Sequence, residues 1–243
     1  MKPDDADALQ RILDAAGGMA YWQSLSAVEV SMSAWGFLFR AKRIRPLHHA
    51  VITVDTTEPR AVMKDFPKPG CTATLLGTHR VEIRDASGAV LRGRDNPRQA
   101  FGGIRHGLYW DDLDFTYFSG YAMWCYLTLP FLLMRRGVSI ERFEQAPGGG
   151  VILTAGFPDF LPAHSPTQKF YFDPSGRLVR HDYTAEVVGG WAKAAHICGD
   201  YRRFGGLWAP TRRRVYPRGP GNRPLPFPTL VALDIHDVRP IPR

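Results

Sequence analysis

The chain has 243 residues, of which 44% are hydrophobic and 22% charged, values that are ordinary for a globular protein with a sizeable core. Its 31 Lys and Arg against 23 Asp and Glu give a net charge of +8, which suits an anionic ligand, a nucleic acid or a membrane surface without choosing among them. The three cysteines, Cys71, Cys125 and Cys198, are odd in number and far apart, which excludes a disulfide framework and a paired metal motif.

The first helix is predicted close to the N-terminus. Residues 1–7 are acidic and lack the apolar core of a signal peptide, so we expect a cytoplasmic protein with reduced thiols. From 5 to 16 the apolar positions Ala8, Leu9, Ile12 and Leu13 recur at helical spacing, and two glycines follow where a helix would end. We expect this helix to cover an edge of the fold.

A run of antiparallel strands is predicted after this helix. The segments 25–40, 49–55, 71–78 and 79–85 are rich in apolar and β-branched residues and are separated by Pro and Gly. Residues 86–88 form a turn that leads into a further strand at 90–91.

Three carboxylates, Asp111, Asp112 and Asp114, come directly before a densely aromatic run that extends to residue 133. Pro130 and scattered Ser, Thr and Gly interrupt the run well short of the ~20 clean apolar residues that a membrane span needs, so we expect no stable membrane insertion. Two interpretations stay open: a buried core helix whose acids are caps, or aromatic side chains around an apolar cavity with acids on its rim.

Strands resume in the second half of the chain. They are predicted at 151–154, 170–172, 178–183, 192–201, 211–216 and 229–238, and the Pro and Gly of residues 173–176 supply a tight turn. We therefore predict one α+β domain over residues 1–243. Its strongly curved antiparallel sheet is interrupted by a helical insertion at about 111–145.

Two short motifs carry a resemblance to a known family. After an N-terminal helix that ends near Gly17 and Gly18, residues 170–180 form an "FD-x-x-G-x-L-x-R" hairpin, and residues 205–213 form a "G-G-L-x-x-P-T-R" strand entry. This arrangement resembles the LolA/LppX type of lipoprotein-carrier half-barrel. The resemblance implies a curved sheet wrapped around an apolar cavity that helices close.

Titratable side chains share one face of the strand near residue 180. Strand alternation places Val179, His181 and Tyr183 together, opposite Arg180 and Asp182. His181 and Tyr183 can exchange protons in general acid and base catalysis, or each can satisfy a polar group in the core. An acid such as Asp111 or Asp114 would assist in the catalytic case.

On the next strand the same alternation turns His196 toward the interior. Two inward histidines could bind a metal if a third ligand joined them, but no His-x-His or Glu-x-x-His spacing supports one, so we expect no metal. There is no Gly-x-Gly-x-x-Gly, phosphate loop or Gly-x-Ser-x-Gly elbow, and we expect no organic cofactor.

Arginines form the second group of candidate residues. Arg94 and Arg213 could each neutralise a ligand carboxylate or phosphate, and solvated strand faces are the alternative. The basic stretch 40–45 is the best candidate for nucleic-acid binding, but an exposed edge strand explains it as well, so we expect no nucleic acid.

The leading functional hypothesis is a cofactor-independent enzyme, an isomerase, cyclase or hydrolase, acting on a hydrophobic small molecule. His181, Tyr183 and His196 with Asp111 or Asp114 would carry the chemistry, and Tyr117, Tyr121 and Trp124 would shape the pocket. The alternative is a non-catalytic carrier or sensor of a hydrophobic, lipid-like ligand. Whether the protein forms a homodimer stays open.

Overall fold

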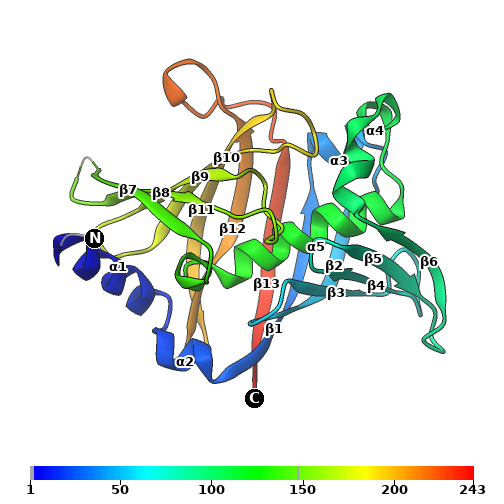
Figure 1. Cartoon of the computed structure of the whole chain (residues 1–243), viewed down its shortest axis with the longest axis horizontal. Helices are drawn as coiled ribbons and strands as arrows, with labels where there is room; N and C mark the ends of the chain where they lie inside the picture. Colours follow the sequence, from blue (N-terminus) through cyan, green and yellow to red (C-terminus); the bar gives the residue numbers. More distant parts are fainter. Residues whose placement is uncertain (1–2, 147) are drawn as a thin grey trace.

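All strands of the protein join one antiparallel sheet (Figure 1). The structure is a computed structural model, and it describes residues 3–146 and 148–243. The strand order is β6-β5-β4-β3-β2-β1-β13-β12-β11-β10-β9-β8-β7. In chain order the strands are β1 Leu25–Trp35, β2 Leu47–Asp55, β3 Arg60–Lys64, β4 Thr72–Leu76, β5 Arg80–Arg84, β6 Val90–Asp95, β7 Ser139–Gln145, β8 Val151–Gly156, β9 Thr167–Phe172, β10 Leu178–Thr184, β11 Lys193–Phe204, β12 Leu207–Pro217 and β13 Val231–Pro242.

The sheet consists of two meanders. Each strand pairs with its sequence neighbour, except at the centre, where β1 pairs with β13 and Val30 lies opposite Val238. Strands β6 and β7 are the outer edges, so among the described residues the sheet does not close into a full barrel. The predicted α+β half-barrel is confirmed.

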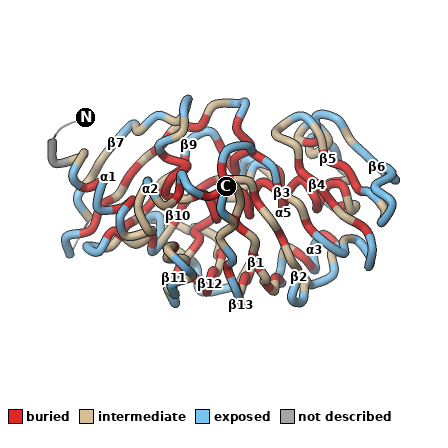
Figure 2. The backbone as a smooth tube through the Cα atoms, turned by 90° about the horizontal axis from the view of Figure 1, so that it is seen from below, coloured by how far each residue is buried: buried red, intermediate tan, exposed pale blue. Residues whose placement is uncertain are grey.

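The helices gather on one side of the curved sheet and at its ends (Figure 1). They are α1 Pro3–Ala15, α2 Met19–Gln23, α3 Phe37–Ala41, α4 Ile104–Leu108 and α5 Asp112–Thr128, with short 3-10 turns at Pro97–Gly102, Phe131–Met134 and Pro220–Asn222. Helix α5 lies across the sheet in contact with β2 to β6, and all its residues from Leu113 onward are buried. An apolar surface on every side of a helix is typical of such a central position, and Figure 2 shows the buried core around it.

Helix α1 packs on the turn between β9 and β10, so it covers an end of the sheet at two inner strands rather than an edge strand. Gly176 in that turn has φ 85°, and a Cβ added there would lie 2.7 Å from the backbone oxygen of Arg11. Only glycine permits both this backbone conformation and this close approach. The predicted turn at 173–176 therefore also seats the first helix.

The predicted strand at 25–40 is too long. Strand β1 ends at Trp35, and Gly36, with φ 139°, turns the chain into α3. A Cβ at Gly36 would lie 2.5 Å from the backbone oxygen of Leu230, so the chain passes directly over the start of β13. The apolar residues 37–39 therefore form a helix at the end of the sheet.

The helical insertion predicted at about 111–145 also ends early. Its helical part stops at Met134, and Ser139–Gln145 is the edge strand β7. Three of its seven residues are charged and four are exposed, so it lacks the apolar alternation that marks a strand. Strand β3 was not predicted either: its apolar run is only three residues long between Arg60 and Lys64, although Ala61 and Met63 are buried.

A register shift in β10 changes one predicted face. The pairing of β10 with β9 slips between Leu178 and Arg180, which turns Val179 outward and leaves it 37% exposed. Leu178 takes the buried position instead. Beyond this bulge the alternation resumes as predicted, so His181 and Tyr183 face the interior.

Candidate functional site

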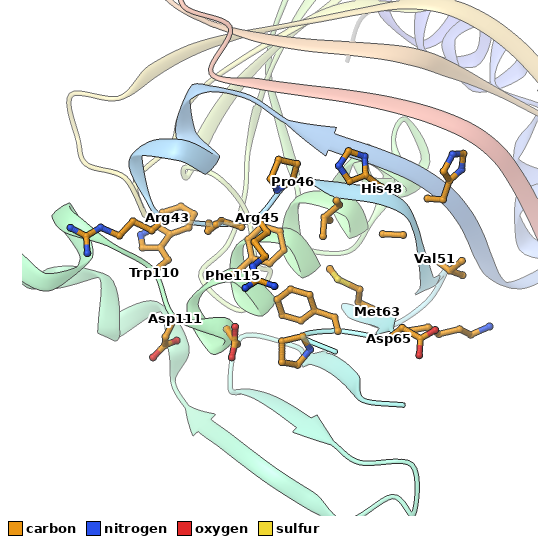
Figure 3. A pocket seen from close by; sticks show the side chains of 18 residues that line it. Arg43, Arg45, Pro46, His48, Val51, Met63, Asp65, Trp110, Asp111 and Phe115 are labelled. Atoms are coloured by element: carbon orange, nitrogen blue, oxygen red, sulfur yellow. The ribbon is translucent and has the colours of Figure 1, made fainter. Parts of the chain in front are cut away.

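A cleft of about 750 Å³ opens between β2, β3 and the N-terminus of α5 (Figure 3). Its lining residues come from 43–51, 63–67 and 110–112, together with Phe115. We call this pocket the cleft. Residues from three segments of the chain meet here because α5 packs over β2 and β3.

The floor of the cleft is apolar. Met63 on β3 and Phe115 on α5 are 4% and 2% exposed, and Trp110 lies beside them just before the helix. The ring of Phe66 lies 5.3 Å from that of Phe115 between centroids, which extends the apolar surface toward the mouth. Figure 3 shows Met63, Phe115 and Trp110 together along this wall.

The charges on the two sides of the mouth differ in their partners. Arg43 and Arg45 are exposed, and among residues 3–146 and 148–243 no carboxylate forms an ion pair with either. On the facing side, Asp111 binds Arg94 at 2.7 Å and Asp112 binds Arg92 at 2.9 Å. Asp111 and Asp112 are therefore neutralised from outside the cleft. Asp65 also lines it and has no ion pair among the described residues, so the unpaired charges, Arg43 and Arg45 against Asp65, sum to a positive value.

Asp111 and Asp114 form a reciprocal cap at the start of α5. The Asp111 carboxylate accepts from the Asp114 N–H at 2.9 Å, and Asp114 accepts from the Asp111 N–H at 2.9 Å. Burial opposes ionisation of Asp111, but the Arg94 guanidinium and the Asp114 N–H hold the pKa of this carboxyl below its ordinary value. The cap alternative raised by the sequence is confirmed for both residues.

Asp114 is fully buried and is the centre of an ion cluster. Its carboxylate accepts a hydrogen bond from Arg94, forms an ion pair with Arg105 at 3.2 Å and lies 3.0 Å from Nε2 of His106. All these groups surround one carboxylate that is closed to solvent. The arrangement fixes α4 and β6 to the beginning of α5, and it leaves Asp114 apart from the cleft surface.

The predicted His181, Tyr183 and His196 do lie together, on the far side of α5. His181 pairs directly with His196 across β10 and β11, and all three side chains are at most 4% exposed. The ring of His181 lies 4.8 Å from Tyr183 and 6.0 Å from His196 between centroids. None of the three lines the cleft.

Two further residues complete this buried histidine–tyrosine cluster, and the sequence did not single them out. His164 stacks on Tyr183 at 3.8 Å, and its ring nitrogens bond Tyr121 at 3.2 Å and Tyr126 at 2.9 Å. The Tyr126 hydroxyl also lies 3.1 Å from that of Tyr183. His164 comes from a Pro-rich loop without periodicity, and Tyr126 lies in a helix that is buried on every side, so neither carries a sequence signal.

Burial sets the charge of the cluster. It lowers the pKa of His164 to about 3 and lowers the pKa values of His181 and His196 well below their ordinary range. It raises the pKa values of Tyr121, Tyr126 and Tyr183. All six groups are therefore neutral at pH 7. No group of three or more His, Cys, Asp or Glu in the described part of the chain is arranged to hold a metal ion.

Arg213 is buried beside this cluster. Its guanidinium lies 5.1 Å from the centre of the Tyr126 ring, and it donates to the Tyr126 carbonyl at 3.2 Å and to the sulfur of Cys198 at 3.5 Å. Arg213 and Tyr126 both line a space of only about 30 Å³. Arg94, the other predicted ligand arginine, is occupied by Asp111 and Asp114.

The three aromatic residues predicted to shape a pocket point to different places. Tyr117 lines a space of about 190 Å³ next to Arg98, and Tyr121 bonds His164 in the core. Trp124 donates to the Asp55 carbonyl at 3.1 Å and lines a second opening of about 490 Å³ near Trp22. The structure does not bring them to a common cavity.

Within the described residues, no helix is both long enough and apolar enough to cross a membrane.

Comparison with known proteins identifies the fold. No protein-family model matches the chain, and no curated protein matches it. A LolA superfamily protein from Nitrosomonas europaea is similar over 98% of this chain and 94% of its own, with a TM-score of 0.52 and 9% identity. A DUF1329 family protein from Desulfovibrio piger is similar over 99% and 94%, with a TM-score of 0.50 and 11% identity. This chain has a LolA-like fold, as the motifs at 170–180 and 205–213 indicated.

Proposed function

We propose that the protein binds an amphiphilic small molecule with an acidic head in the cleft and holds it without converting it. One observation carries the proposal: an apolar floor around Met63 and Phe115 lies next to Arg43 and Arg45, which have no carboxylate partner among the described residues. Such a surface fits a molecule with an apolar part and an anionic head.

The energetics of the cleft favour this ligand class. Each methylene group that a ligand moves from water onto the floor contributes about 0.8 kcal/mol. The guanidinium group of Arg43 or Arg45 can take a carboxylate or phosphate in bidentate geometry. The facing acids do not repel such a head strongly, since Arg92 and Arg94 already neutralise them.

The LolA-like half-barrel supports a carrier or sensor, because this architecture implies an apolar cavity under a curved sheet. Fold alone does not establish activity, so the proposal depends mainly on the geometry and charge of the cleft.

The enzymatic hypothesis has less support. His181 and Tyr183 are 1% and 4% exposed and line none of the cleft, so a ligand bound there would not reach them. Both are also neutral at pH 7, with pKa values moved far from neutrality by burial, which opposes the proton exchange that catalysis needs. Turnover of a bound ligand that is lost in His181→Ala would favour the enzyme.

We expect the protein to bind a fluorescent fatty acid in a titration, and we expect Phe66→Ala to weaken this binding about tenfold through lost apolar contact.

Arg43→Gln combined with Arg45→Gln should weaken binding of the acid about tenfold and leave binding of its methyl ester unchanged, because only the acid carries a charge. Mass spectrometry of the probe after incubation should show it unaltered.

Phe160→Ala is the matched control, since Phe160 is 61% exposed on a loop that does not line the cleft. It should bind both probes like the unmodified protein. Equal binding of the acid by all variants would refute the cleft as the site, and equal weakening of acid and ester by the arginine variant would refute the acidic head.

A further inference from the structure

We infer that one end of the half-barrel docks on the surface of a membrane that contains anionic lipids. The surface is built by four segments, residues 35–46, 105–110, 188–193 and 217–230, which we call the rim. The inference goes beyond ligand binding and does not depend on an occupied cleft.

The four segments form one continuous edge. The Arg218 N–H donates to the Lys193 carbonyl at 2.9 Å, and the Phe37 N–H donates to the Thr229 carbonyl at 2.9 Å. On the other side of α3, the Trp110 N–H donates to the Lys42 carbonyl at 3.1 Å. In Figure 1 the loop before β11 and the loop after β12, together with α3 and α4, lie along the upper end of the molecule.

Large apolar side chains project from this edge. Phe227 is 80% exposed, Trp191 78%, Leu108 63% and Phe37 48%, and each comes from a different one of the four segments. Scattered single exposed apolar residues are normal, but this concentration on one edge indicates a contact surface. Trp and Phe beside basic groups are typical of the interface between lipid headgroups and acyl chains.

The charge of the rim has one sign. Its four segments contain eight Lys and Arg and no Asp or Glu, although the whole chain has 23 acids. Exposed bases without an ion pair in the described structure occur in three of the segments: Arg40, Arg43, Arg45, Lys193 and Arg223. A surface with free cations and no acids complements an anionic bilayer.

The mixture of side chains favours a bilayer over a nucleic acid. Single-stranded nucleic acid needs aromatic rings on which bases stack along a basic groove. Leu108 at the end of α4 and the Pro-flanked Leu225 and Phe227 instead offer exposed apolar side chains, which suits insertion between lipid headgroups. Arg43 and Arg45 belong to both the rim and the cleft, so a docked molecule would present the cleft mouth near the membrane.

Vesicle sedimentation tests the inference. We expect the purified chain to sediment with vesicles of phosphatidylcholine mixed with phosphatidylglycerol, to bind phosphatidylcholine alone weakly, and to be released by salt. Trp191→Ser combined with Phe227→Ser should weaken binding about tenfold or more, because this variant lacks the two apolar side chains that would enter the bilayer interface. Lys193→Gln and Arg223→Gln should each weaken it about fivefold.

Matched substitutions at other places serve as controls. Leu91 is 50% exposed on the edge strand β6, and Arg202 is exposed near the hairpin of β11 and β12, at the opposite end of the sheet. Leu91→Ser and Arg202→Gln should bind vesicles like the unmodified chain. Phe66→Ala should weaken fatty-acid binding about tenfold and keep vesicle binding, which separates the rim from the cleft.

Equal weakening by rim and control variants would overturn the inference, as would equal binding to neutral and anionic vesicles. Binding to single-stranded RNA without binding to vesicles would assign the rim to nucleic acid and also overturn it.

Discussion

The buried histidine–tyrosine cluster makes the free energy of unfolding depend on pH. The imidazoles of His164, His181 and His196 are at most 1% exposed, and both ring nitrogens of His196 have no hydrogen-bond partner among the described residues. Protonation in place would bury a cation near the guanidinium of Arg213. The folded state therefore excludes protons that the unfolded chain accepts.

The free energy of unfolding should fall as the pH drops below the ordinary histidine pKa of 6.5. Because burial depresses the folded pKa of each histidine, its contribution is complete above pH 6.5 and is lost as the pH falls toward the folded value, about 3 for His164. Within that window each histidine should lower the free energy of unfolding by about 1.4 kcal/mol for each unit that the pH falls. Urea unfolding at several pH values measures the slope.

His196→Phe should reduce this slope by about a third and leave the free energy of unfolding at pH 7 unchanged or higher, since it removes a buried ring without partners. His79→Gln, at an exposed position, is the control and should leave the slope as it is. A slope that is the same in His196→Phe would show that this imidazole accepts protons in the folded state.

Among the acids at the start of α5, Asp114 should contribute most to the free energy of unfolding. Asp114→Asn should lower the free energy of unfolding by about 3 kcal/mol, because Arg94 and Arg105 lose a fully buried counter-ion. Thermal or urea unfolding followed by circular dichroism measures the loss.

Asp112→Asn is the matched control. Asp112 binds Arg92 at 2.9 Å but is 40% exposed, so its replacement should cost at most about 1 kcal/mol. If the two substitutions cost the same, the cluster around Asp114 does not hold the helix in place.

At the scale of elements, α5 determines how the core closes. The helix is buried on all sides and lies directly on the sheet, and Gly120 marks the closest approach. A Cβ at Gly120 would lie 2.8 Å from the Cβ of Leu75 on β4. The glycine is therefore a packing requirement, even though glycine weakens an isolated helix.

Gly120→Ala should lower the free energy of unfolding by about 1–3 kcal/mol, because the gain in helix propensity is smaller than the cost of overpacking. Chemical denaturation provides the measurement. Gly107→Ala in α4 is the control: nothing lies within 4 Å of an added Cβ, so this change should be neutral or stabilise by up to about 1 kcal/mol. Stabilisation by Gly120→Ala would show that α5 can move away from β4.

At the scale of the whole molecule, local patterns predicted the fold and not the cleft. The turn at 173–176 and the strand alternation around His181 and His196 could be read correctly because each depends on residues close in sequence. The bulge that exposes Val179 depends on pairing with β9, which alternation within one strand does not encode. His164 reaches the cluster from an irregular loop, so no periodic sequence pattern predicts that its side chain is buried there.

The cleft was also not predicted, because it depends even more on residues that are distant in the sequence. Arg43, Met63 and Phe115 meet only because α5 packs over β2 and β3. In the sequence Met63 follows Arg43 by 20 residues, and Phe115 follows Met63 by 52. Asp111 and Asp112 do line the mouth, but the aromatic residues after them, which the sequence placed around the same cavity, lie elsewhere. Their neutralisation by Arg92 and Arg94 follows from the three-dimensional arrangement alone.

The pairing of β1 with β13 has a consequence for biosynthesis. During translation the meander β1 to β6 can form as soon as it leaves the ribosome, and the meander from β7 onward can follow, since each strand pairs with its sequence neighbour. The join between them must wait until Val231–Pro242 has been made, because Leu25–Trp35 finds its partner there. Until then β1 presents an open edge, whose unpaired N–H and C=O groups can pair with a strand of another chain.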